Sequence, residues 1–316
     1  MRSDKVAVVA LGGNAITRKG QEDTIARQFA NTRRSLEPIV KLIRDGYKLA
    51  VTHGNGPQVG NALLRVELAR GKAPILPLGI CVADLQGGMG YMITQSLQNR
   101  LHREGIKRPV VTIVSQMIVD RNDPALSNPT KFIGQFYTRE QARRMVEESS
   151  WIVKEDSDRG WRRVVPSPHP LRLVAGETIK QLVLEGTIVI TAGGGGIPVY
   201  TQKDGSYEGV DAVIDKDLGA AVMASDIGAG LLLNLTDVNK VALNYGKEDQ
   251  KALDRLTVAE AKEYLAQGHF PPGSMGPKIE AAISFLEKGG KEVVISSIEE
   301  GYEAVTGDAG TTIVPS

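Results

Sequence analysis

Three glycine-rich clusters are the residues best suited to chemistry, because each directly follows an apolar run typical of a strand. They are Leu11–Asn14, His53–Gly56 and Gly193–Gly196. Without Cβ atoms, such loops let backbone N–H groups approach an anion, and a helix that starts there adds the positive end of its dipole. A glycine after a strand is also typical of a plain tight turn. Three clusters together favour a site that holds several anionic groups, such as a phosphoryl donor beside a small anionic acceptor.

Three lysines could supply positive charge to such a site. Lys216, followed by Asp217, opens one expected helix, and Lys278 lies in the first turn of another, where a lysine opposes the helix dipole unless an anion binds beside it. Lys131 lies in an irregular segment. Phosphoryl transfer needs positioning and positive charge more than covalent chemistry. We therefore expect Lys216 and Lys278 to act on phosphate groups while Asp217 holds both; the alternative for any single lysine is a solvated side chain.

Familiar catalytic and nucleotide motifs are missing from the sequence. It contains no G-x-x-x-x-G-K-[ST], G-x-G-x-x-G, H-E-x-x-H or G-x-S-x-G string and no protein-kinase signature set. The nearest glycine string, Gly54–Gly60, has the wrong spacing for dinucleotide binding. The single cysteine, Cys81, excludes an internal disulfide and a thiolate metal cluster, and we interpret it as a buried small residue. We expect no metal held by the protein alone.

Composition argues against several classes of partner. Among 316 residues, 38 lysines and arginines nearly balance 37 aspartates and glutamates, and a net charge of +1 provides no field that attracts nucleic acid or a membrane surface. No apolar run approaches the roughly 20 residues of a spanning helix. The sequence opens on a strand without a basic and apolar leader, so we expect a cytoplasmic protein that acts on small molecules.

Apolar, β-branched runs alternate with helical patterns along most of the chain. We expect strands over 5–11, 47–53, 109–115, 187–192, 229–234 and 292–296, and helices over 22–45, 57–70, 85–104, 138–147, 173–185, 214–226, 257–266 and 276–288. This alternation predicts an α/β fold, a three-layer αβα sandwich around a mostly parallel open sheet. Ligands of such sheets bind outside the carboxyl ends of the strands, where the glycine clusters lie.

The segment 119–168 breaks this alternation. It contains a charged stretch over 154–160, which predicts a hairpin tip, and it ends in Pro166–Pro170, which resists helix and regular strand. The alternating pattern then resumes. We expect a single domain over 1–316 from which 119–168 protrudes as a small subdomain or lid.

Six strings of the sequence together resemble those of carbamate kinases, in the amino acid kinase superfamily. They occur in the family's order and span nearly the whole chain: Ala10–Ala15, His53–Gly60, Arg163–Pro168, Ala192–Val199, Val213–Asp217 and Gly273–Lys278. Other members of the superfamily share the early glycine loop but not the whole set. One motif departs from the family, because K-P-I-G-P-F reads K-F-I-G-Q-F over 131–136 here. Two prolines are lost, so we expect a less stiff loop.

The resemblance implies reversible phosphoryl transfer between ATP and carbamate, giving ADP and carbamoyl phosphate, with Mg²⁺ bound mainly through the nucleotide phosphates. It implies catalytic roles for Lys131, Lys216, Asp217 and Lys278. It places the acceptor and phosphate at Gly12, Gly13, Asn14, Gly54, Asn55, Gly194, Gly195 and Gly196, and the nucleotide near Asp237, Val238, Tyr245, Met275 and Pro277. It further implies a homodimer, a role in arginine metabolism, an acceptor-binding half over roughly 1–210 and a nucleotide-binding half over 211–316.

Two other functions stay open. One is another acylphosphate-forming kinase of the same superfamily, or one that acts on a nucleoside monophosphate. The other is a non-catalytic nucleotide-binding sensor on the same fold, against which the retained Lys216, Asp217 and Lys278 argue. Formation of ATP from ADP and carbamoyl phosphate distinguishes carbamate kinase activity from both. For Tyr245 and Met275, plain packing is the alternative to nucleotide binding.

Overall fold

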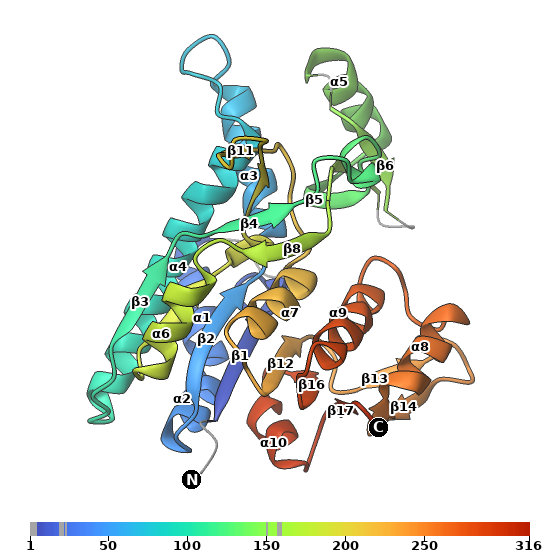
Figure 1. The fold of residues 1–316 in the computed structure, drawn as a ribbon. Helices are drawn as coiled ribbons and strands as arrows, with labels where there is room; N and C mark the ends of the chain where they lie inside the picture. Colours follow the sequence, from blue (N-terminus) through green and yellow to red (C-terminus); the bar gives the residue numbers. More distant parts are fainter. Residues whose placement is uncertain (1–4, 19–21, 23, 150, 157–159) are drawn as a thin grey trace.

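All six expected strands lie in one central sheet (Figure 1). The computed structural model describes residues 5–18, 22, 24–149, 151–156 and 160–316. The eight strands of this sheet run in the order β15 (Arg255–Thr257), β17 (Thr311–Val314), β16 (Glu292–Ser297), β12 (Leu231–Thr236), β1 (Val6–Leu11), β2 (Lys48–His53), β9 (Ile188–Thr191) and β3 (Val110–Ile113). The six strands from β16 to β3 are parallel, and β17 runs antiparallel to β16.

Burial on both faces explains why these runs form parallel strands. Every residue of β1 and β12 is buried, as near-continuous apolar sequences require in a sheet with helices on either side. Because β1, β2 and β9 are neighbours and parallel, their carboxyl ends meet at one edge. That edge carries all three glycine clusters.

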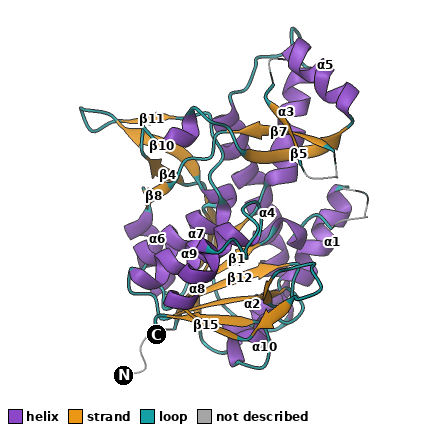
Figure 2. Cartoon of the chain, turned by 90° about the vertical axis from the view of Figure 1, so that its right-hand side faces the viewer, coloured by secondary structure: helices purple, strands orange, loops and turns teal. Residues whose placement is uncertain are grey.

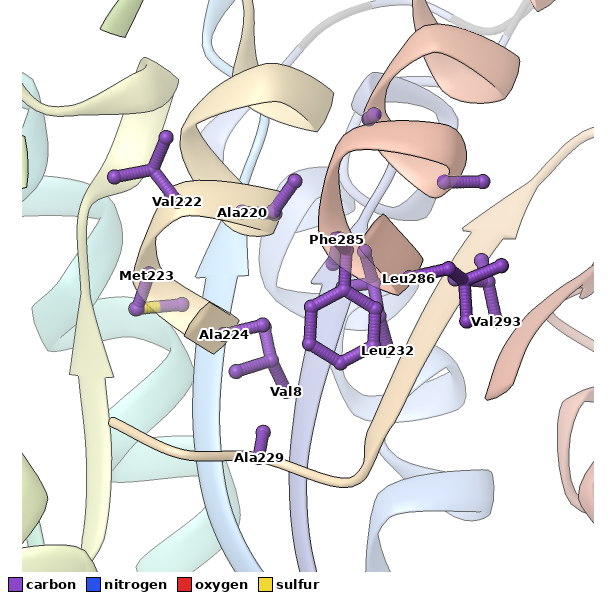
Figure 3. Close-up of a cluster of buried hydrophobic side chains, with 14 of the residues drawn as sticks. Val8, Ala220, Val222, Met223, Ala224, Ala229, Leu232, Phe285, Leu286 and Val293 are labelled. Atoms are coloured by element: carbon purple, nitrogen blue, oxygen red, sulfur yellow. The ribbon is translucent and has the colours of Figure 1, made fainter. Parts of the chain in front are cut away.

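Helices cover the two faces of the sheet. One face packs against α6 (Gly176–Leu184), α7 (Lys216–Asp226), α8 (Val258–Ala266) and α9 (Met275–Glu287), and the other against α1 (Ile25–Ser35), α2 (Glu37–Arg44), α4 (Leu78–Arg103) and α10 (Gly301–Thr306). Figure 3 shows the first contact, where Val8 and Leu232 of the sheet meet Ala224 of α7 and Phe285 of α9. The predicted three-layer αβα sandwich is confirmed.

A second, smaller sheet and a protruding unit lie above the carboxyl edge (Figure 2). The second sheet contains β11 (Tyr207–Gly209), β10 (Ile197–Thr201), β4 (Gln116–Val119) and β8 (Pro170–Leu173). Between β4 and β8 the chain forms β5 (Lys131–Tyr137), α5 (Arg139–Ser149), β6 (Val153–Glu155) and β7 (Trp161–Val165), a three-stranded antiparallel sheet with one helix. We call residues 131–165 the excursion.

The excursion packs on the main body through an apolar cluster that buries Ile133 and Val165, and at one point it meets the main body backbone against backbone. A Cβ atom on Gly60 of α3 (Gly56–Leu68) would overlap the backbone of Gly134 in β5. Gly134 also has a φ of 73°. Both positions therefore require glycine, since they let a helix and a strand meet without side chains between them. The hairpin predicted over 154–160 falls between β6 and β7, but its residues 157–159 lie outside the described part.

Several predicted boundaries were wrong. The helix expected over 22–45 is two helices, α1 and α2, because Pro38 lies in the first turn of α2 and cannot continue a helix from before it. The helix expected from 173 begins at Gly176, after β8. The hairpin of β13 (Val241–Leu243) and β14 (Lys251–Leu253), the strand pair β15 and β17, and helix α10 were not predicted.

The helix-dipole expectation holds for one glycine cluster of the three. Helix α3 begins at Gly56, directly after the second cluster. The first and third clusters instead form short 3₁₀ turns over Gly13–Ala15 and Gly193–Gly195. No helix in the described part of the chain has both the length and the apolarity to cross a membrane.

Candidate active site

The three glycine clusters touch one another at the carboxyl edge of the sheet. A Cβ atom on Gly54 would lie 3.2 Å from the backbone nitrogen of Gly13 and 3.5 Å from Cδ of Lys216. A Cβ on Gly193 would overlap the His53 ring, and one on Gly194 would overlap the Asn55 amide. The loops are thus packed backbone against side chain, and the glycines leave the room for it.

The third cluster has a backbone that only glycine adopts easily. Gly194, Gly195 and Gly196 have φ angles of 64°, 91° and 95°. A Cβ on Gly195 would also lie 2.7 Å from the Ile214 side chain, just before α7. This loop is therefore fixed in shape, and it presents its backbone where β9 ends.

Asn55 is an unpaired donor inside this arrangement. Its side chain is buried, with 4% of the residue exposed, and among the described residues its Nδ2 atom has no hydrogen-bond partner. An unsatisfied buried amide is costly, so a partner from a bound ligand would satisfy it. Neighbouring His53 is also buried, and desolvation lowers its pKa to about 4, so the ring is neutral at pH 7.

A charged network lies beside the loops, where α7 and α9 begin. Both lysines predicted there bind one carboxylate: Lys216 Nζ donates to Asp217 Oδ1, and Lys278 Nζ donates to Asp217 Oδ2 at 2.8 Å. The side chains of Lys216, Asp217 and Lys278 are 11%, 5% and 12% exposed. From β12, Asn234 Nδ2 donates to Asp217 Oδ1 at 2.7 Å. The network joins three elements around one buried anion.

The charges of this network support one another. Burial alone would raise the pKa of Asp217, but the ammonium groups of Lys216 and Lys278 outweigh burial and hold that pKa far below its ordinary value. Burial lowers the pKa of Lys216, with Asp217 opposing and Lys278 adding to the effect. Lys278 also loses solvation, yet Asp217 raises its pKa above the ordinary value. Two lysines against one carboxylate leave one positive charge at this site.

Lys131 reaches the same region from the excursion. Its Nζ atom forms an ion pair with Asp215 Oδ2, while Asp215 Oδ1 accepts from the backbone N–H of Asp217 and so caps α7. Desolvation opposes ionisation of Asp215, but the Lys131 ammonium lowers its pKa overall. The sequence places Asp215 in a characteristic string but did not identify it as a site residue. An aspartate before a helix is a capping signal, which could have indicated it.

The residues expected near the nucleotide fall into two groups. Asp237, Val238 and Tyr245 line a cavity of about 570 Å³ between the end of β12, the β13–β14 hairpin and the ends of α10. Met275 and Pro277 do not line that cavity; they lie in the first turn of α9 beside Lys278. Of the other predicted residues, Asn14 belongs to the first 3₁₀ turn, and its side chain lies outside the described part.

Comparison with known proteins agrees with this geometry. The model of the amino acid kinase family matches residues 5–297. A carbamate kinase of Thermococcus kodakarensis is 49% identical over 98% of this chain and 99% of its own length, and one of Pyrococcus furiosus is 48% identical over the same shares. The solved carbamate kinase of Giardia lamblia bound to AMP-PNP superposes with a TM-score of 0.90 at 40% identity and covers 99% of both chains. The chain belongs to the amino acid kinase family, and these relatives within it are carbamate kinases.

Proposed function

We propose that this protein transfers a phosphoryl group reversibly between ATP and carbamate, giving ADP and carbamoyl phosphate. The observation that carries the proposal is the Lys216–Asp217–Lys278 network, which lies directly against glycine loops at the carboxyl edge of the sheet. Several relatives at 43–49% identity over nearly the whole chain are carbamate kinases, which supports the same substrates here.

The network suits the charge that develops during transfer. In the transition state, negative charge spreads over the equatorial oxygens of the phosphoryl group, and preorganised cations stabilise it without reorganising. Lys216 and Lys278 supply those cations. Asp217 fixes both ammonium groups and stays ionised, so it takes no proton during the reaction. In this proposal the free Nδ2 of Asn55 and the backbone N–H groups of Gly13 and Gly194 bind the carbamate and the transferred phosphate. The N–H groups of Gly12, Gly54, Gly195 and Gly196 already donate to backbone carbonyls, so these glycines shape the loops around the ligand.

The two halves of the chain contribute different ligand sites in this proposal. The glycine loops lie within roughly 1–210 and hold the acceptor. The cavity lined by Asp237, Val238 and Tyr245 lies within 211–316 and holds the nucleoside, with Met275 and Pro277 nearer its phosphates. The Asp217 oxygens already bind two ammonium groups, so Mg²⁺ enters with the nucleotide and is held mainly by phosphate oxygens and water. It neutralises phosphate charge alongside the lysines.

We also propose that 119–168 acts as a lid. Lys131 lies on the excursion and reaches Asp215, next to the network, so a shift of the excursion would move a cation toward or away from the phosphates. Closure would exclude water, which otherwise hydrolyses a reactive phosphoryl group. Loss of prolines at 132 and 135 permits a wider range of open positions.

A donor comparison tests the proposed reaction. Purified protein is mixed with ADP, Mg²⁺ and carbamoyl phosphate, and ATP is measured with a coupled enzyme; acetyl phosphate replaces carbamoyl phosphate in the control. We expect ATP from carbamoyl phosphate and little from acetyl phosphate. ATP from acetyl phosphate alone would indicate a different acylphosphate kinase, and no ATP from either would indicate a nucleotide-binding sensor.

The wider biology follows from kinship rather than from the site. We propose a homodimer in the cytoplasm that takes part in arginine metabolism and binds neither nucleic acid nor membrane. The net charge of +1 and the relatives' identity support this setting. Sedimentation equilibrium of the purified protein tests the dimer, and a monomer at micromolar concentration would contradict it.

A further inference from the structure

Asn234 is a polar residue in an apolar strand. It belongs to the buried run Leu231–Thr236 of β12, and its neighbours across the sheet are Ala10 of β1 and Ile295 of β16. It shares a strand face with Leu232, which packs in the apolar cluster beneath α7 and α9. Asn234 is 1% exposed, and an amide buried so deeply is costly unless both of its ends are hydrogen-bonded. A leucine would suit this apolar strand better, so we expect the amide to have polar partners in the folded protein.

Both ends of the Asn234 amide bind the charged network. Nδ2 donates to Asp217 Oδ1 at 2.7 Å, and Oδ1 accepts from Lys216 Nζ at 3.3 Å. The donor therefore faces the carboxylate and the acceptor faces the ammonium, which is the only favourable orientation of an amide between these two charges. The strand, held between β1 and β16, thus fixes the positions of both charged groups from the sheet side.

We propose that Asn234 is a positioning residue of the active site, which orients the Asp217 carboxylate and supports the charged form of Lys216. The inference rests on the proposed phosphoryl transfer, in which Lys216 must be protonated. The charged groups that face the Lys216 ammonium are Asp215, which caps α7, Asp217 on α7 and Lys278 on α9. Asn234 adds a neutral acceptor from β12, which stabilises the ammonium without adding charge to the site.

Two variants of Asn234 predict opposite shifts of the same titration. Asn234→Ala removes the acceptor from Lys216, so the pKa of Lys216 falls. The alkaline limb of the pH–activity profile, where Lys216 loses its proton, therefore moves to lower pH. Asn234→Asp keeps an oxygen there and adds negative charge, so the pKa rises and the alkaline limb moves to higher pH. Both lose the donor to Asp217, so we expect kcat to fall about tenfold in each, with KM for ADP and carbamoyl phosphate little changed.

A variant on the other face of the same strand is the control. Leu233 is the neighbouring residue in β12 and packs in the opposite apolar cluster, away from the network. Leu233→Ala creates a cavity and lowers stability. Leu233→Ala should nevertheless show the same alkaline limb of the pH–activity profile as the unmodified protein. A shift of that limb by Leu233→Ala would mean that general loss of stability moves the titration, and it would overturn the assignment to Asn234.

A readout independent of the reaction decides the proposal. Lysine labelled with ¹³C at Cε is followed by NMR across alkaline pH, and the Lys216 signal is identified by its absence in Lys216→Ala. We expect its midpoint to fall in Asn234→Ala and to rise in Asn234→Asp; should the alanine variant not fold, the isosteric aspartate variant decides. An unchanged midpoint in a folded variant overturns the proposal. If the unmodified protein forms no ATP from carbamoyl phosphate, the proposed reaction fails while this titration still decides the role of Asn234.

Discussion

Lys131 is held in the candidate site differently from Lys216 and Lys278. Lys216 and Lys278 share one buried carboxylate with Asn234, and these groups come from α7, α9 and β12 of the main body. Lys131 stands on the excursion and meets the main body's site through an ion pair with Asp215. Its side chain is 26% exposed, against 11% and 12% for the other two lysines. The difference teaches that two of the cations belong to the main body and the third is carried by the excursion. In our proposal the distance of this third cation from the phosphates changes when the excursion shifts.

The largest expected effect comes from the built-in cations. Lys216→Ala or Lys278→Ala should lower kcat by about 10²–10³, because each removes a preorganised charge from the transition state. The KM for nucleotide should change much less. Steady-state kinetics in both directions measures this. The matched control is Lys262→Ala, an exposed lysine of α8 that pairs with Glu287, and near-normal kcat in both site variants would refute their assignment.

Two glycines of the loops should respond in different ways. Gly195 has a φ of 91° and lies against Ile214, so Gly195→Val should destabilise the fold itself. A Cβ on Gly13 meets no atom within 4 Å, so Gly13→Val should fold and instead block the approach of an anion, with at least about a tenfold loss of kcat/KM. Thermal unfolding by circular dichroism separates stability from activity. A folded and fully active Gly13→Val would remove the first loop from the site.

The cation on the excursion should matter less than the two cations of the main body. Lys131→Ala should lower kcat by about tenfold. It should also lower the melting temperature, because the largely buried Asp215 carboxylate loses its cation and keeps, among the described residues, only the N–H of Asp217. Lys154, also on the excursion, binds the Pro129 carbonyl and no carboxylate of the site, so Lys154→Ala is the control. A loss in Lys131→Ala as large as in Lys278→Ala would remove the distinction between the excursion's cation and those of the main body.

Hydrogen exchange tests the mobility that this distinction implies. Peptides from 119–168 should exchange faster than those from β9 in the free protein, and an ATP analogue should slow them. The basis is that the excursion lies outside the central sheet and its two helix layers, and that the apolar cluster around Ile133 and Val165 and the Lys131–Asp215 pair join it to the main body. Protection equal to that of β9 and unaffected by ligand would mean that the segment is a rigid part of the fold.

The smallest effect concerns the stability of the loop region. Burial lowers the pKa of His53 to about 4 from an ordinary 6.5, so the unfolded chain binds a proton more readily than the folded one. The stability that the neutral ring contributes is complete above pH 6.5 and is lost as pH falls toward 4, by about 2 kcal/mol between pH 7 and pH 5. Urea unfolding at pH 7 and pH 5 should show this loss in the free energy of unfolding for the unmodified protein and no such loss for His53→Gln. An equal loss of unfolding free energy in both proteins would contradict the assignment of this pH dependence to His53.

The central sheet could be predicted because its signal is local. Apolar runs such as Val6–Leu11 are buried on both faces, and no other element accommodates them. The excursion sheet was missed because strands such as Lys131–Tyr137 are half exposed and interrupted. Their apolar residues therefore follow neither the two-residue period of a strand nor the 3.6-residue period of a helix. The break between α1 and α2 follows from Pro38, whose effect the helical pattern around it concealed.

The candidate site was predictable where motif and helix start coincide. Lys216, Asp217 and Lys278 lie in such strings, and the structure brings them together. Asn234 carries no sequence signal of its own, because its partners stand on a different element and its strand reads as apolar. The partner of Lys131 is likewise 84 residues away in the chain. Contacts of this kind depend on the fold and appear only once the sheet edge and the helices are assembled.

The most direct test of the proposed transfer follows phosphorus itself. Carbamoyl phosphate and MgADP are mixed with the unmodified protein and, separately, with Lys216→Ala, and ³¹P NMR records every phosphorus species over time. We predict that ATP appears in step with the loss of carbamoyl phosphate, and that the variant is slower by about 10²–10³. Conversion of carbamoyl phosphate to inorganic phosphate without ATP, or equal rates in the two proteins, would contradict phosphoryl transfer by this network.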